Sequence, residues 1–365
     1  MPPLTDLHRH FEAGISPEAI AALAQKNKVT QVLTRNGKVS IEGVDVQNPE
    51  SIRAYYQRIY IGLTQPDGMT KFLDSLGLPI SVIKSLEDLE GAAYHQIVEQ
   101  ATAGNIHTEL RGSPYTYQEG LNEHASMEDV INAIRRGIVR AYGEHRASGA
   151  YIACFSRNKV DKYGQAVVDA VLRTHSSDNP VGIDIAGGPE GQFPPAMFEK
   201  LMAPVGEAGV PITVHAGEQS RWPDFEETPS SFVIDAIKKL GARRIEHGTS
   251  LITDSRAREI VKEKGVHIEC CPSSSNALGY VSFERHPLKT FLDEGLSCFV
   301  NTDDPVPFLT PSVGDILDSY GKALKVAPKD IVKMTLNAIN AAFVAPERRK
   351  ELLGRLRMAV PDGAI

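Results

Sequence analysis

Short apolar runs recur along the chain, and each ends in polar or charged residues. Eight of these runs predict β-strands, at 4–7, 106–111, 150–155, 181–185, 210–214, 242–245, 265–271 and 297–301. Helix-like segments lie between most of them, for example at 195–208, 230–240, 254–264 and 287–294. Strands that alternate with helices predict a parallel sheet. Eight such units indicate an α/β fold, a (β/α)8 TIM barrel, whose chemistry sits at the carboxyl ends of the strands.

Residues 11–105, almost a hundred, separate the first two predicted strands, far too many for one β–α connection. Ser16 is a candidate N-cap with Pro17 at the first helical position, and helical patterns follow at 52–63 and 69–76. We therefore expect one catalytic domain over 1–365. Residues 11–105 form its helical insertion over the barrel mouth, either a substrate lid or a surface insertion without function.

The composition of the chain limits the classes of partner that it can bind. The chain is 42% hydrophobic and 23% charged, with a net charge of −7, so it is globular and a poor partner for nucleic-acid phosphates. No window reaches the ~18 apolar residues of a membrane span, and no signal peptide is apparent. The cysteines form no C-x-x-C pair, which is typical of buried, reduced thiols. We expect a cytoplasmic protein that acts on a small molecule, without nucleic-acid or membrane partners; the subunit number is left open.

Histidines and aspartates follow three predicted strands. His8 and His10 are two residues apart in an extended segment, so both imidazoles can reach one metal ion. His215 ends the fifth strand, and Asp303 with Asp304 follows the eighth. Three histidines and one aspartate suit zinc, with iron, cobalt or manganese as alternatives. The competing interpretation is a set of buried, hydrogen-bonded histidines, with one aspartate serving as a helix N-cap.

Glu218 and His247 are then left without a ligand role. Glu218 lies one short turn beyond His215, and His247 precedes Gly248 at the end of the sixth strand. A bound divalent ion lowers the pKa of water toward about 7. This division of labour, with His247 as base and Glu218 as proton shuttle, predicts attack of water on an sp² carbon, protonation of a nitrogen and loss of a leaving group.

These motifs resemble the adenosine deaminase family of the amidohydrolase superfamily, from His8 to about Pro311. The likeness is carried, in order along the chain, by His8-x-His10, Asp184-Ile185-Ala186-Gly187, Val214-His215-Ala216-Gly217-Glu218, His247-Gly248, Glu269-Cys270-Cys271-Pro272, the stretch 286–292 and Asn301-Thr302-Asp303-Asp304-Pro305. The resemblance implies one zinc ion per chain, bound by His8, His10, His215 and Asp303. It also implies that Glu218 protonates purine N1, and that His247 orients and deprotonates the attacking water. Asp304 would bind N7, and the Gly187 backbone N–H would contact N3.

The chain departs from the family pattern at several positions. Glu12 stands where adenosine-specific members have an aspartate that meets the ribose, and Ala13 replaces a glycine. Glu246 replaces the glycine before the catalytic histidine, and Gly188-Pro189-Glu190 replaces an acidic pair. We expect all of these residues to lie where the rest of the substrate is read, away from the metal.

The expected function is zinc-dependent hydrolytic deamination of a 6-aminopurine nucleoside, which converts an adenosine-like substrate to an inosine-like product and ammonia. The nearest alternatives are deamination of free adenine, of aminodeoxyfutalosine or of an N6-substituted purine. The longer Glu12 side chain favours free adenine if it excludes ribose. An amidohydrolase that cleaves an amide or ester, and a non-catalytic homologue, are the more distant alternatives.

Overall fold

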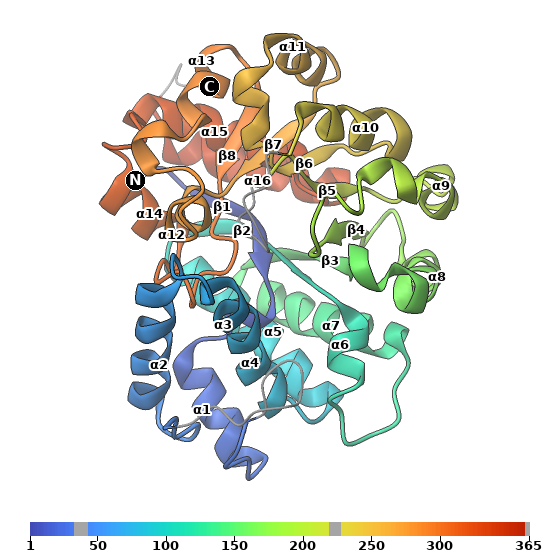
Figure 1. Ribbon diagram of the computed structural model, residues 1–365, viewed down its shortest axis with the longest axis vertical. Helices are drawn as coiled ribbons and strands as arrows, with labels where there is room; N and C mark the ends of the chain where they lie inside the picture. The colour runs from blue at the N-terminus through green and yellow to red at the C-terminus, as the bar shows by residue number, and fades with distance from the viewer. Residues whose placement is uncertain (33–42, 219–227, 362–365) are drawn as a thin grey trace.

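The computed structural model describes residues 1–32, 43–218 and 228–361. In these residues eight parallel strands form two four-stranded sheets, β1-β2-β3-β4 and β5-β6-β7-β8 (Figure 1). Isolated parallel bridges, Ile183 with Ile212 and Arg9 with Asp303, link the two sheets at both seams. All eight expected strands are confirmed, in the order of a (β/α)8 barrel. The strands are β1 (Leu4–His10), β2 (Asn105–Gly112), β3 (Ser148–Ser156), β4 (Val181–Ala186), β5 (Thr213–Ala216), β6 (Arg244–His247), β7 (His267–Cys270) and β8 (Ser297–Val300).

Helices surround the strands and carry the apolar packing. The helices of the described residues are α1 (Pro17–Lys26), α2 (Pro49–Gly62), α3 (Gly68–Ser75), α4 (Gly77–Val82), α5 (Leu86–Thr102), α6 (Pro114–Gln118), α7 (Met127–His145), α8 (Gln165–Thr174), α9 (Glu199–Glu207), α10 (Ser230–Leu240), α11 (Ser255–Glu263), α12 (Pro272–Ala277), α13 (Leu288–Asp293), α14 (Val313–Tyr320), α15 (Pro328–Ala341) and α16 (Pro346–Ala359). The predicted helical segments correspond to α9, α10, α11 and α13. Helices α7, α8, α9, α10 and α11 contact one another in sequence around the barrel, and α15 packs on β1 and β8.

Local sequence signals set several helix ends. Ser85 and Ser126 begin α5 and α7 with capping boxes, in which each serine side chain accepts from an aspartate N–H three residues later. Gly241 ends α10 at φ 72°, a left-handed conformation that glycine adopts without strain. Ser16 occupies the N-cap position of α1 before Pro17, as expected. Its hydroxyl, however, donates to Glu99 instead of accepting from the helix.

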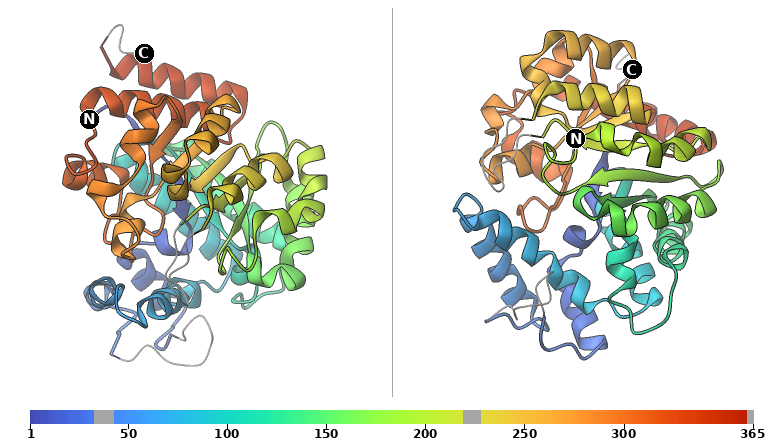
Figure 2. Two further views of the ribbon diagram at one scale, coloured as in Figure 1. Left: turned by 45° about the horizontal axis from the view of Figure 1, so that its top comes forward. Right: turned by 45° about the vertical axis from the view of Figure 1, so that its right-hand side comes forward.

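The predicted insertion is shorter than expected. Helices α1 to α4 gather at one end of the barrel, and they stay there in both views of Figure 2. Helix α5, however, packs against β2 and α7 and is therefore part of the barrel wall. The extension beyond the wall thus ends before Leu86, not at 105; its residues 33–42 lie outside the described residues. The lid function stays a prediction.

Two further observations concern the chain as a whole. Among the described residues, the helices include none that is long and apolar enough to cross a membrane. All four cysteines are free and buried, as expected from their spacing.

Candidate active site

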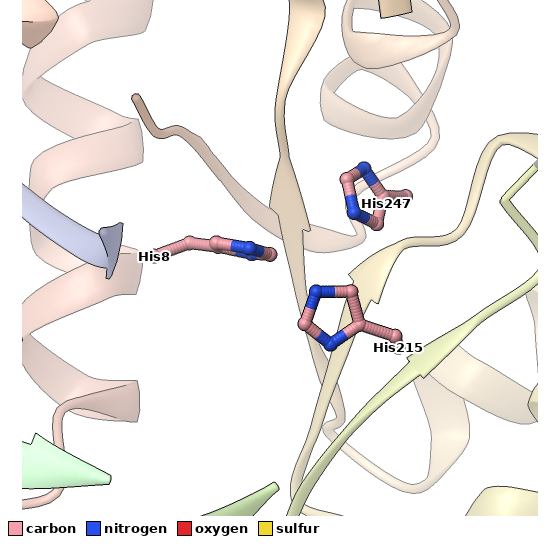
Figure 3. Close-up of side chains that lie close together, drawn as sticks. All are labelled: His8, His215 and His247. Atoms are coloured by element: carbon pink, nitrogen blue, oxygen red, sulfur yellow. The ribbon is translucent and has the colours of Figure 1, made fainter. Parts of the chain in front are cut away.

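Four histidine rings lie close together at the carboxyl ends of the strands. His8 and His10 belong to β1, His215 to β5 and His247 to β6. The His8 ring centroid is 5.3 Å from that of His10, 4.9 Å from that of His215 and 5.2 Å from that of His247. Figure 3 shows His8, His215 and His247 pointing toward one another from three strands. Imidazoles that lie far apart in the sequence therefore form one cluster.

Asp303 joins the histidine cluster from the residues after β8. Its backbone N–H donates to the His8 carbonyl at 2.8 Å, and its carbonyl accepts from the His10 N–H at 2.9 Å. Its φ of 64° is uncommon outside glycine and typical of strained functional positions. Asp303 Oδ1 lies 3.2 Å from His8 Nε2 and 3.4 Å from His10 Nε2. The structure therefore brings the four predicted ligands together.

The side chains of this cluster fit a divalent cation. Ligand atoms of His8, His10 and Asp303 lie within 4.8 Å of one another, as do those of His8, His215 and His247. His8 Nε2 is buried and has no hydrogen-bond partner among the described residues, although Asp303 Oδ1 is close. Imidazole nitrogen together with carboxylate oxygen is a donor set that suits zinc. Because His247 shares one of these groups, the four-residue ligand set stays a prediction.

The outer nitrogens of the histidines separate His247 from the other rings. His8 Nδ1 lies 3.3 Å from Glu269 Oε2, and His215 Nδ1 lies 3.2 Å from Asp184 Oδ1. His247 Nδ1 is buried without a hydrogen-bond partner among the described residues, and the same is true of His8 Nδ1, although a carboxylate lies beside the latter. Metal-bound histidines almost always donate their second ring N–H to a carboxylate, carbonyl or water. His8 and His215 therefore have the support typical of ligands, and His247 is better placed to act as a base.

Glu218 and His247 form an acid and base pair beside the cluster. Glu218 Oε2 lies 3.7 Å from His247 Nε2. Burial, followed by the Asp303 and Glu190 carboxylates, raises the pKa of Glu218 well above its ordinary value. Burial also lowers the pKa of His247 well below its ordinary value. These opposite shifts favour the protonated form of Glu218 and the neutral form of His247, so the first can donate a proton and the second can accept one.

Asp304 and Gly187 face the same cavity. Burial, with the Asp303 and Glu12 carboxylates, raises the pKa of Asp304 well above its ordinary value, so this side chain can also donate a hydrogen bond. Gly187 follows β4 at φ 61°, and a Cβ there would lie 3.3 Å from Ser156 Oγ. Glycine thus accommodates both the conformation and the tight space at this position.

Glu12 is fixed by a tyrosine that the sequence analysis did not single out. Its side chain accepts a short hydrogen bond from the Tyr117 hydroxyl, and both residues are buried. Tyr117 lies on α6, and a Cβ at Gly112 would come within 2.0 Å of its hydroxyl oxygen. The small residue at the end of β2 therefore makes room for the tyrosine that positions Glu12.

These side chains line a cavity of about 200 Å³ at the carboxyl ends of the strands. The lining includes every predicted site residue except His8, which is fully buried. It also includes apolar side chains, several of which belong to α3. The cavity lining consists of His10, Glu12, Met69, Phe72, Leu73, Leu76, Gly112, Ser113, Cys154, Ser156, Ala186, Gly187, Gly188, His215, Glu218, His247, Leu278, Tyr280, Asp303, Asp304 and Phe308.

The barrel interior beneath the histidines is charged. Arg111 of β2 contacts Glu246 of β6, and its Nη2 lies 2.6 Å from Glu269 Oε2 of β7. Arg244 of β6 lies 2.7 Å from Glu109 of β2 and 2.6 Å from Glu269. All five side chains are fully buried. Their signal in the sequence is a pair of polar residues two positions apart within a short strand, a spacing that places both on one face.

One expectation about the departures from the family pattern is wrong. Glu12 and Gly188 line the cavity, as expected for residues that read the substrate. Glu246 instead faces the barrel interior, where it contacts the His215 ring. Its neighbour His247 turns toward the cavity with a φ of 60°. Glu246 thus faces the barrel interior, whereas His247 faces the cavity.

Comparison with known proteins places this arrangement in a family. The family model described as "Adenosine deaminase" matches residues 3–359. An adenosine deaminase of Shewanella loihica is 29% identical, covering 96% of this chain and 97% of that protein. An adenosine deaminase of Pectobacterium atrosepticum is 30% identical, covering 96% and 95% of the two chains.

Solved structures agree with this placement. An adenine deaminase from Arthrobacter aurescens superposes with a TM-score of 0.80 at 26% identity, covering 98% of this chain and 99% of its own. An amidohydrolase from Burkholderia ambifaria with bound Zn shares the fold, with a TM-score of 0.75 at 20% identity over 98% of this chain and 91% of its own. The chain therefore belongs to the adenosine deaminase family, and it is a hydrolase that deaminates purines.

Proposed function

We propose that this enzyme binds one zinc ion through His8, His10, His215 and Asp303 and hydrolyses the 6-amino group of a purine nucleoside of the adenosine type. The observation that carries the proposal is the pairing of Glu218, a carboxyl group with a raised pKa, with His247, an imidazole with a lowered pKa, beside a histidine–aspartate cluster. The bound Zn of the Burkholderia amidohydrolase supports the choice of metal.

The side chains then divide the proton transfers between them. A divalent ion bound at the cluster supplies Lewis acidity, which brings the pKa of a water molecule toward neutrality. His247 takes a proton from the attacking water. Glu218 donates its proton to purine N1, which makes C6 more electrophilic. The attacking oxygen forms a bond to C6, and the proton taken up by His247 passes to the amino group, which then leaves as ammonia. The remaining hydroxyl proton returns to Glu218, so that the 6-oxopurine is formed, one water is consumed and one ammonia is released.

Two further groups orient the purine ring. Asp304, whose raised pKa favours its protonated form, is proposed to donate a hydrogen bond to N7. The Gly187 backbone N–H is proposed to donate to N3, and Arg157 fixes this turn by donating to the Gly187 carbonyl at 3.2 Å. A purine has ring nitrogens, N7 and N3, that can accept hydrogen bonds from Asp304 and from the Gly187 N–H. This pairing distinguishes a purine deaminase from a general amide or ester hydrolase.

The substrate is proposed to be a nucleoside without phosphate. The cavity of about 200 Å³ is smaller than the ~300–1,000 Å³ typical of drug-sized ligands. Glu12, fixed by Tyr117, offers a carboxylate at its wall as an acceptor for ribose hydroxyls. The full-length relatives named adenosine deaminase support this choice. Helix α3 contributes Met69, Phe72 and Leu73 to the cavity lining and is proposed to act as the lid.

Free adenine is the second candidate. The Arthrobacter structure, described as an adenine deaminase, superposes over nearly the whole chain. In this case Glu12 shortens the cavity and excludes the sugar. The two candidates make opposite predictions about Glu12, because a carboxylate that binds ribose favours the nucleoside and one that excludes ribose opposes it.

Steady-state kinetics with a panel of aminopurines tests the proposal. We expect kcat/KM to be highest for adenosine or a 5′-modified adenosine, lower for 2′-deoxyadenosine and lowest for adenine. Glu12→Gln should reduce nucleoside turnover much more than adenine turnover, because a site built to bind a hydroxyl loses that contact. Tyr117→Phe keeps the Glu12 carboxylate but removes the hydrogen bond that fixes it. This variant should therefore also reduce nucleoside turnover more than adenine turnover, but by less than Glu12→Gln. A preference for adenine, or a gain of nucleoside activity in Glu12→Gln, would establish the second candidate instead.

A further inference from the structure

Glu246 lies in the barrel interior and is held from three sides. Its Oε1 contacts Arg111 Nη1 and accepts a hydrogen bond from Thr213 Oγ1 at 2.9 Å. Its Oε2 contacts His215 Nδ1 and lies 4.0 Å from His8 Nδ1. The side chain is completely buried. A fully buried carboxylate is costly unless charges and donors satisfy it, so this arrangement is specific rather than incidental.

His215 has two carboxylates at its outer nitrogen. Asp184 Oδ1 lies 3.2 Å from His215 Nδ1, and Glu246 Oε2 contacts the same atom. The Asp184 carboxylate is within hydrogen-bond distance of Nδ1 and so favours the ring proton there, which leaves the Nε2 lone pair free. Glu246 Oε2 has no hydrogen-bond partner among the described residues, and it places its charge beside the same nitrogen. The second oxygen of Asp184 also accepts from the Cys154 thiol at 3.1 Å. Asp184 therefore accepts from both Cys154 and His215, and Glu246 places a second carboxylate beside the same His215 nitrogen.

Negative charge predominates in this part of the interior. The ion pairs join the four carboxylates of Glu109, Asp184, Glu246 and Glu269 to the two guanidinium groups of Arg111 and Arg244. All six side chains are fully buried. Charges in such a dry region are poorly screened, so excess negative charge attracts a cation strongly.

We propose that Glu246 is a positioning residue of the metal centre, which orients His215 and adds a buried negative charge that strengthens cation binding. This inference rests on the zinc site of the proposed function. The residue acts through His215 and does not touch the substrate cavity. It goes beyond the family pattern described above, in which a glycine occupies this position.

Zinc affinity of the purified full-length protein, measured by competition with a chromogenic chelator, tests the proposal. Glu246→Gln keeps the size of the side chain and removes its charge, and we expect zinc affinity to fall about tenfold to a hundredfold. Glu109→Gln is the matched control, because Glu109 is equally buried and contacts Arg244 but none of the proposed ligands. It should lower the melting temperature and reduce zinc affinity much less than Glu246→Gln does, because its carboxylate contacts none of the proposed ligands. An equal loss of zinc affinity in the two variants would mean that Glu246 has only a general structural role.

A shorter carboxylate keeps the test decisive if Glu246→Gln does not fold. Glu246→Asp retains the charge but withdraws it from His215 Nδ1, and we expect weaker zinc binding than in the wild type. Unchanged affinity in whichever variant folds overturns the inference. Wild-type protein that binds no zinc overturns the proposed zinc site itself, and with it this inference. The two failures are therefore distinguishable from one set of titrations.

Discussion

At the scale of single residues, the proposed chemistry depends on two side chains whose pKa values are shifted by burial. Glu218 has a raised pKa because burial and nearby carboxylates disfavour its charged form. His247, only 3.7 Å away, has a lowered pKa because burial disfavours its charged form. Desolvation thus changes the two groups in opposite directions and produces an acid and a base from neighbours. The same effect would be lost if water filled the cavity.

We expect Glu218→Gln to retain zinc and to lose at least about a hundredfold in kcat, which is the usual effect of removing a positioned acid. The amide has nearly the same shape but no transferable proton. Metal content by elemental analysis and kcat for adenosine check the two parts separately. Loss of zinc from this variant, or near-normal turnover, would show that Glu218 is not the proton donor.

The pH dependence of turnover should reveal what controls Glu218. Its raised pKa extends the pH range over which it stays protonated, so kcat should fall on the alkaline side as it ionises. Asp303 and Glu190 face it as carboxylates, whereas Arg157 lowers its pKa and His247 lies beside it. The Glu190 carboxylate accepts a hydrogen bond from the Gly217 N–H at 3.0 Å. In Glu190→Gln the side-chain carbonyl oxygen can accept the same hydrogen bond.

Removal of the Glu190 charge lowers the pKa of Glu218, so in Glu190→Gln the alkaline limb of kcat should move to lower pH. Thermal unfolding of the same variant shows whether the fold is retained. An alkaline limb at the wild-type position, with the fold intact, would contradict this electrostatic account.

Adjacent residues show where sequence reasoning failed at this scale. The motifs placed His8, His10, His215 and Asp303 correctly near one another, because strand ends converge in a barrel. They also assigned Glu246 to the substrate side. The spacing of Arg244 and Glu246 in β6 places both on the inner face of the strand. The sequence does not reveal that His247, at the end of this strand, adopts a φ of 60° and faces the cavity.

At the scale of elements, apolar runs with polar ends predicted all eight strands, because each strand packs against wall helices. The alternation within the strands was harder to interpret, since their inner faces carry Glu109, Arg111 and similar residues instead of apolar side chains. Helix α5 was assigned to the insertion. Its amphipathic pattern indicates a helix but does not identify the partner on which the helix packs, and the structure shows that the partner is the barrel wall.

Helix α3 should contribute binding energy rather than chemistry. Phe72 lines the cavity and stacks on Phe308 with ring centroids 5.2 Å apart. We expect Phe72→Ala to raise KM for adenosine about tenfold with a smaller change in kcat, because burial of an aromatic side chain is worth about 1.5–3 kcal/mol. Ile61→Ala on α2 is the control, since Ile61 is 77% exposed. Equal KM values in the two variants would show that α3 does not contact the substrate.

At the scale of the whole molecule, the proposed zinc ion connects the two four-stranded sheets. His8 and His10 lie on β1 of one sheet, whereas His215 lies on β5 of the other and Asp303 follows β8. Only the folded barrel brings these residues together. Binding therefore stabilises the native state, by about 2.7 kcal/mol when free zinc is a hundred times its Kd.

We expect chelation to lower the melting temperature and added zinc to restore it. His215→Ala should lose most of its zinc and show almost no zinc-dependent shift in melting temperature, because one of the four proposed zinc ligands is missing. His286→Ala is the control, since His286 is also buried but lies outside the cluster. It should be less stable than the wild type yet keep the full zinc-dependent shift. A shift of wild-type size in His215→Ala would mean that zinc stabilises the protein from another site, and that the two sheets are not joined through the metal.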